Sequence, residues 1–349
     1  MTFRRHVVVS LLLGAMMAWS AAPAVADPAV PTHYRSTVTG LSAVDGDPVP
    51  VEVEILGGDA FLVVRAAAGT TVEVPGYEGE PYVRITPDGT VEVNERSPAR
   101  WLNDARYGGA EVVVPALADA DAPPSWVVAA HDGEYAWHDH RIHFMSPVVP
   151  PGIDVRRGEV QEVFTWEIPL RVDGRDVLVS GELSWVPGPG AATPVGAVAV
   201  LLAAVLLLLV RRPSWVGPTV ATTAVVALAV GIAANLGLPP GAEGELSLVA
   251  LPLGALTLVL AGTVLGRRHE AARILVPASG VPMAVWGMLQ LGTLTRPIVP
   301  NPLPLMAVRT TVVLVLAVAT AALVVAGRGL LDRTRLQADD GRRTDLPTG

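Results

Sequence analysis

The apolar residues of this chain follow two different patterns. Up to about residue 187 they come in short runs that alternate with polar residues, the period of two that is typical of half-buried β-strands. Beyond residue 190 they form long unbroken runs, each long enough to cross a bilayer as a helix. The pattern therefore predicts an all-β domain at residues 27–190 and an α-helical transmembrane bundle at residues 191–327.

Turn dipeptides separate the short runs of the first part. Asp132-Gly133 and Asp173-Gly174 supply the positive-φ positions that tight hairpins require, and the second pair joins the runs 164–172 and 176–185. About ten strands at this spacing predict an antiparallel sandwich, and an immunoglobulin-like arrangement is favoured over a barrel. The other clear runs are 51–55, 61–64, 71–74, 82–85, 91–93 and 126–128.

Five apolar segments in the second part have the length of a membrane span. They cover residues 194–210, 215–236, 246–265, 272–291 and 303–326. Ten arginines flank one set of ends and Arg296 alone lies in the opposite loops, so the positive-inside rule places the β domain outside and the C-terminus in the cytoplasm. We expect a multi-pass protein of the plasma membrane whose tail, residues 328–349, is disordered. The ten arginines are Arg211, Arg212, Arg267, Arg268, Arg273, Arg328, Arg333, Arg335, Arg342 and Arg343.

The N-terminus has the form of a secretory signal. Arg4 and Arg5 precede an apolar run at 7–19, and Ala24-Val25-Ala26 supplies a cleavage pattern. We expect residues 1–26 to be removed, the alternative being an uncleaved anchor helix. Five spans agree with this prediction, because an exported first domain and a cytoplasmic tail require an odd number of crossings.

Composition excludes several kinds of chemistry. The chain has no cysteine, so disulfides, thiolate nucleophiles and thiolate metal ligands are impossible. All 25 basic residues are arginine, so lysine Schiff bases are excluded as well. The pI near 5.4, with 26 acidic side chains against 11 arginines between residues 27 and 190, argues against a nucleic-acid partner. No nucleophile elbow or zinc-protease motif occurs, so the sequence does not favour an enzyme.

Three of the seven histidines lie in the segment 137–145, Trp-His-Asp-His-Arg-Ile-His-Phe-Met. In a regular strand His138 and His140 would share one face and His143 would face the other way. A bulge or turn near Arg141 would bring the three imidazoles together as a copper or zinc site, to which Met145 would add a soft ligand for Cu(I).

Other residues near this segment enter the same interpretation. His131, beside the Asp132-Gly133 turn, is a further candidate ligand, and so is His33. The competing interpretation is a hydrogen-bonded staple in which the imidazoles bridge polar groups and Asp139 pairs with Arg141. The sequence leaves both open.

Two further places carry candidate binding residues. Tyr77 and Tyr82 flank a loop of glycine and acidic residues, which is either a tight turn or part of a binding surface. Inside the spans, Gln290 and Arg309 are the notable polar side chains. They either hold helices together, with Arg309 snorkelling outward or bonding Gln290, or they form a lipid-headgroup or substrate site.

The segments 76–82, 97–103 and 137–145 together resemble those of a set of high-GC bacterial membrane proteins that join a secreted β domain to a C-terminal multispan bundle. The resemblance implies this architecture and carries no activity. The layout is also loosely similar to that of copper-resistance proteins with a periplasmic β-sandwich on a membrane bundle. This chain departs from that pattern because it lacks intramembrane histidines and a histidine directly after the cleavage site.

These observations leave three functions open. The first is a membrane-anchored outer binding or envelope-associated module that coordinates copper or zinc. The second is a metal-free interaction or assembly protein with a partner in the cell envelope. The third is a membrane enzyme, or a transporter of lipids or small molecules, with its site near Gln290 and Arg309.

Overall fold

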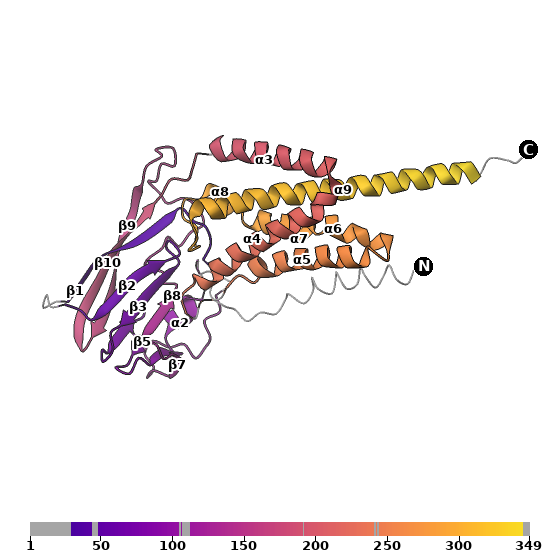
Figure 1. Ribbon diagram of the computed structural model, residues 1–349. Coiled ribbons are helices and arrows are strands. Elements are labelled where there is room, and N and C mark those ends of the chain that lie inside the picture. The colour runs from indigo at the N-terminus through magenta and orange to yellow at the C-terminus, as the bar shows by residue number, and fades with distance from the viewer. Residues whose placement is uncertain are drawn as a thin grey trace, which may run out of the picture.

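The computed structural model describes residues 29–43, 48–104, 106, 112–190, 192–240, 242 and 244–344. The predicted signal peptide at residues 1–26 lies outside this part of the chain. A β-rich domain sits at one end of an elongated helical bundle, and successive long helices run alternately away from it and back (Figure 1). The division of the chain into a β domain and a helical bundle agrees with the sequence pattern.

The β domain consists of two antiparallel sheets. The larger has the strand order β1-β10-β9-β4-β5-β6-β7 and the smaller has the order β2-β3-β8. The predicted hairpin at Asp173-Gly174 joins β9 to β10, and both residues have positive φ. The strands are β1 (Tyr34–Ala43), β2 (Val51–Leu56), β3 (Phe61–Ala66), β4 (Val72–Pro75), β5 (Pro81–Ile85), β6 (Val91–Asn94), β7 (Trp126–Ala130), β8 (Glu134–Trp137), β9 (Gln161–Val172) and β10 (Arg175–Trp185).

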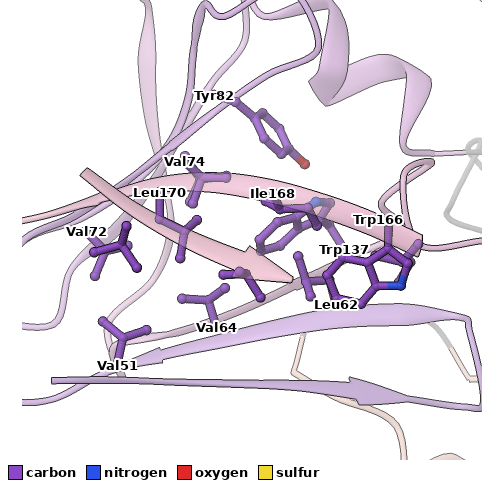
Figure 2. Packing of buried hydrophobic residues seen from close by; sticks show 14 of the residues in the cluster. Val51, Leu62, Val64, Val72, Val74, Tyr82, Trp137, Trp166, Ile168 and Leu170 are labelled. Atoms are coloured by element: carbon purple, nitrogen blue, oxygen red, sulfur yellow. The ribbon is translucent and has the colours of Figure 1, made fainter. Parts of the chain in front are cut away.

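The two sheets enclose a single apolar core, part of which is seen in Figure 2. Strand β9 buries every second residue from Trp166 to Val172, as the alternating sequence requires. Gly181 on β10 leaves room for the Trp166 ring, because a Cβ there would lie 2.0 Å from it. The indole Nε1 of Trp166 donates to Ser36 Oγ at 2.8 Å, so its one polar atom is satisfied inside the core.

Strand β3 is buried on both faces, and this fixes the β domain to the bundle. Leu62 and Val64 face the core between the sheets, whereas Phe61 and Val63 pack with Leu238 and Ala242 from the segment that follows α4. Thr32 and Ile298 also exchange two backbone hydrogen bonds, of 2.9 and 3.2 Å. The domain is therefore packed against the bundle as well as tethered to it.

Four helical segments are long and apolar enough to cross a membrane: 213–236, 247–265, 272–289 and 305–329. A further helix, α3, has 20 residues, of which the described apolar part covers 199–211. The helices are α2 (Pro98–Leu102), α3 (Ala192–Arg211), η1 (Pro213–Trp215), α4 (Val216–Leu236), α5 (Ser247–Leu265), η2 (Glu270–Ile274), α6 (Leu275–Ala278), α7 (Gly280–Leu289), α8 (Gly292–Thr295) and α9 (Leu305–Thr344).

Small residues let the helices of the bundle approach closely. A Cβ on Gly231 of α4 would lie 2.3 Å from the carbonyl oxygen of Leu248, and one on Gly280 would lie 2.9 Å from that of Ala319. The same Leu248 carbonyl accepts a hydrogen bond of 3.1 Å from the buried indole of Trp286. Close backbone approach and a satisfied indole together hold α4, α5 and α7 in contact.

Local structure differs from the sequence predictions at several points. The helix predicted to end near residue 327 continues to Thr344, because residues 330–340 include good helix formers and no proline. Ser97 precedes α2 but makes no capping bond, because its hydroxyl donates to buried Glu80 at 2.5 Å. Helix α5 runs through Pro252, whereas the fourth apolar segment is divided between helices α6 and α7.

Candidate functional site

The histidine-rich segment is a tight turn and not a strand. Strand β8 ends at Trp137, and the Ile142 amide donates to the Asp139 carbonyl at 3.1 Å. Of the two cases that the sequence left open, the structure has the turn near Arg141 and not the regular strand. The reason is local: an aspartate that bonds the backbone two residues later offers the chain an alternative to a sheet ladder. We call residues 138–143 the histidine turn.

The Asp139 carboxylate is the centre of this turn. It is completely buried and accepts four hydrogen bonds, from the Trp137 indole at 2.8 Å and from the Arg141 amide, Nε and Nη2 at 3.0, 2.8 and 2.6 Å. Burial alone would raise the pKa of Asp139, but the hydrogen bonds and charge of Arg141 outweigh it and hold the pKa below its usual value. Asp139 and Arg141 thus form the predicted staple.

The three imidazoles of the turn have different environments. His138 is buried, stacks on Phe61 and places Nδ1 2.5 Å from the Ala60 carbonyl, to which it donates. His140 is partly exposed, and its ring lies 5.4 Å from that of His143. His143 is 1% exposed, and neither of its nitrogens has a hydrogen-bond partner among the residues that the structure describes. A buried imidazole with two unsatisfied nitrogens is uncommon in a folded protein.

The predicted ligand set does not come together as one centre. Met145 is exposed, and His131 lies beyond the opposite end of β8, near Thr90. His33 stacks on Trp185 and bonds the Val186 carbonyl, away from the turn. Within the part of the chain that the structure describes, no group of three or more histidine, aspartate or glutamate side chains has the spacing of a metal site.

The loop after β4 packs directly on the histidine turn. The hydroxyl of Tyr77 accepts from the His140 amide at 2.8 Å and donates to Asn103, while its ring stacks on His140 and lies under Arg141. Tyr82 is buried and meets the Trp137 ring edge-on at 6.0 Å. Burial raises the pKa of Tyr77, which keeps its hydroxyl protonated. Tyr77, predicted as a turn or surface residue, therefore contacts the histidine turn directly, whereas Tyr82 packs on Trp137 at the end of β8.

A second buried ion pair lies beside the histidine turn, and it was not predicted from the sequence. Nη2 of Arg106 lies 2.8 and 2.7 Å from the two oxygens of Asp59, and both side chains are buried. Burial raises the pKa of Asp59, and the charge of Arg106 partly offsets this. Two glycines directly before Asp59, with positive φ, mark an unusually tight turn and were the available signal.

A cleft opens where the edges of the two sheets diverge. We call it the edge cleft; its volume is about 390 Å³. Strands β7 and β8 end their respective sheet orders, so neither has a second neighbouring strand within the described chain. Asn103 lines the cleft, and its buried side chain accepts the hydrogen bond of the Tyr77 hydroxyl. The cleft is lined by Phe61, Val93, Glu95, Arg100, Asn103, Asp104, Val127, Val128, Ala129, Tyr135, Ala136, Trp137, His138 and Ala242.

The two polar side chains singled out in the spans also have defined positions. Arg309 donates from Nε to the Thr293 carbonyl at 3.0 Å and from Nη2 to the Arg296 carbonyl at 2.8 Å, so it caps the end of α8. Gln290 accepts a bond of 3.3 Å from Thr293 and lines a separate cavity. Arg309 therefore joins helices as the first interpretation proposed, although through backbone carbonyls and not through Gln290.

The neutral state of His143 predicts a pH dependence. Burial, together with the positive charge of Arg106 and the neighbouring His140 and His138, lowers the pKa of His143 to about 3, which Asp139 only partly opposes. The unfolded chain binds a proton near pH 6.5 and the folded one does not, so this group lowers stability progressively as the pH falls below about 6.5.

We expect the β domain to lose about 2 kcal/mol of unfolding free energy from this group between pH 7 and pH 5. His143→Phe should remove this part of the loss, whereas His131→Phe, which removes an exposed imidazole, is the control. Pulse proteolysis of the full chain in urea measures both. Equal pH slopes for the wild type and His143→Phe would contradict the assignment.

Comparison with protein families, with curated proteins and with solved structures gave no match to this chain. The interpretation of the site therefore depends on its geometry. That geometry consists of a satisfied staple at Asp139, an unsatisfied imidazole at His143 and an open cleft between two strand edges.

Proposed function

We propose that this protein is a membrane-anchored binding module of the cell envelope whose β domain holds an extended segment of a partner protein in the edge cleft. The observation that carries the proposal is the position of the cleft between β7 and β8, each of which is an edge strand of its sheet within the described chain. A free strand edge offers unpaired backbone N–H and C=O groups to another extended chain.

The side chains of β7 fit such a partner. Val127 and Val128 are 46% and 48% exposed, which is high for valines of a regular strand. Their pairing with β6 is regular from Trp126 to Val128, and a register shift follows before Ala130. An added strand would therefore pair along this short stretch. Exposed apolar contacts on both faces of β7 would stabilise it.

The lining of the cleft adds polar recognition. Arg100 and Asp104, which both line the cleft, form an ion pair of 2.7 Å at the end of α2. Such convergent polar groups beside aromatic walls are typical of sites that select an orientation of the bound segment. The hydrogen bonds of Asp139 hold Trp137, a cleft residue, in place where β8 ends.

The proposal includes the placement of the module. Five membrane crossings, with the β domain outside and the arginine-rich ends in the cytoplasm, agree with the positive-inside rule and with the alternating direction of the helices. The β domain shares two antiparallel sheets with an immunoglobulin-like sandwich. Its seven and three strands differ from the four and three strands of that fold.

Selection of displayed random peptides against the full chain in nanodiscs tests the proposal. We expect selected peptides to alternate apolar and polar residues and to bind Val128→Arg at least tenfold more weakly, because the charge occupies the cleft edge. Val160→Arg, at an equally exposed valine outside the cleft, is the matched control. N-methylation of alternate peptide amides should also abolish binding. Peptides that bind both variants equally would refute the proposal.

Copper or zinc binding is a second candidate, and the unsatisfied nitrogens of His143 favour it. The neutral imidazole is the form that binds a metal, and the His140 ring lies next to it. His138, which donates from Nδ1 to a carbonyl, has the orientation that metal-binding histidines commonly show.

Calorimetric titration of the full chain with Cu(II) and Zn(II) separates this candidate from the first. A metal site predicts a dissociation constant below about 10 μM that His143→Ala and His140→Ala each raise at least tenfold. His131→Ala should have no effect. Absence of binding in this range, or binding that the two variants leave unchanged, would exclude the metal site.

A further inference from the structure

A cavity of about 260 Å³ lies where the bundle meets the β domain. We call it the junction cavity. It is bounded by the C-terminal end of α4, the start of α5, the end of α7 and the beginning of α9, and the N-terminal arm at residues 29–31 closes one side. These are the helix ends next to the β domain (Figure 1). In a bilayer this level corresponds to the headgroup region.

Among the described residues that line the junction cavity, one carries a positive charge and one a negative charge. The guanidinium of Arg296 has no hydrogen-bond or ion-pair partner among the described residues, although its backbone carbonyl binds Arg309. Glu245 accepts a hydrogen bond from Ser247 through Oε1, and its backbone amide binds Asn235. A cavity with an unpaired cation and a carboxylate is suited to a zwitterion.

The opposite side of the junction cavity is apolar and continues onto the surface of the bundle. Leu248, Leu289 and Val308 line it. Leu289 is also 55% exposed on a helix that is long and apolar enough to cross a membrane. An apolar chain that leaves the cavity past Leu289 would enter the hydrocarbon directly. The polar side of the cavity therefore matches the headgroup of a lipid at the bilayer interface, and the apolar side matches its acyl chains.

We propose that the junction cavity binds the headgroup of a zwitterionic phospholipid, with the phosphate at Arg296, the amine at Glu245 and the acyl chains along Leu289. The proposal is independent of the partner segment in the edge cleft, because the two sites share no lining residue. Gln290, which also lines the junction cavity, supplies an amide that can donate to the phosphate.

Native mass spectrometry of the delipidated full chain in detergent tests this site with phosphatidylethanolamine as the probe. We expect one lipid to bind first and Arg296→Gln to weaken that event at least tenfold, because it removes the one cation among the described residues that line the cavity. Arg268→Gln, at an exposed arginine on the other end of the bundle, is the matched control. Gly292→Leu should also prevent binding, because its side chain would occupy space next to Arg296 and Pro31.

Three further probes define the ligand. Diacylglycerol with the same chains should bind at least tenfold more weakly, since it lacks the phosphate. Glu245→Gln should weaken binding of phosphatidylethanolamine and leave phosphatidylglycerol unchanged. Inorganic phosphate that binds as tightly as the lipid would identify free phosphate as the occupant and overturn the lipid proposal. Equal lipid binding by Arg296→Gln and the wild type, with both proteins folded by circular dichroism, would overturn the site itself.

Discussion

The ionised carboxylate of Asp139 is the constraint on which this end of the β domain depends. A charge in the interior is tolerated only when it is paired and hydrogen-bonded, and four donors from Trp137 and Arg141 meet that condition. The bonds stop β8 at Trp137 and turn the chain. As a result His138 reaches Ala60, His140 reaches Tyr77, and the edge of β8 faces open space in place of a further strand.

The histidine turn also contributes to the contact between the β domain and the helical bundle. Ala60 accepts the bond from His138, and with its neighbours Phe61 and Val63 it packs against Leu238 and Ala242 of the bundle. The edge cleft includes Ala242, so one wall of the proposed binding site comes from the membrane part of the chain. A partner segment in the cleft would therefore contact both parts, and the position of the domain on the bundle would affect binding.

The sequence predicted the fold better than the site, for physical reasons. Alternation and turn glycines are local signals, so β9, β10 and their hairpin were placed correctly, as were four long apolar helices. For the histidine turn the sequence left a regular strand and a turn near Arg141 both open, because neither its burial nor the hydrogen bonds of Asp139 can be read from spacing. The pairing of Asp139 with Arg141 was foreseen as one alternative. The contacts with Tyr77, Asn103 and the Asp59–Arg106 pair were not, since they join residues separated by tens of positions.

Hydrogen exchange of the full chain in nanodiscs, compared between wild type and Asp139→Asn, tests the central role of the Asp139 carboxylate most directly. The substitution removes the negative charge that compensates Arg141. It also places the NH2 group of the new amide next to the N–H donors of Trp137 and Arg141. Loss of one partner of a buried ion pair lowers the free energy of unfolding by about 3–5 kcal/mol. The amides of Arg141 and Ile142 and of strand β8 should exchange faster, while those of α5 and α7 stay unchanged. Asp154→Asn, which breaks an exposed pair with Arg157, is the control and should change little. Protection of β8 and the histidine turn equal to the wild type in Asp139→Asn would contradict this account.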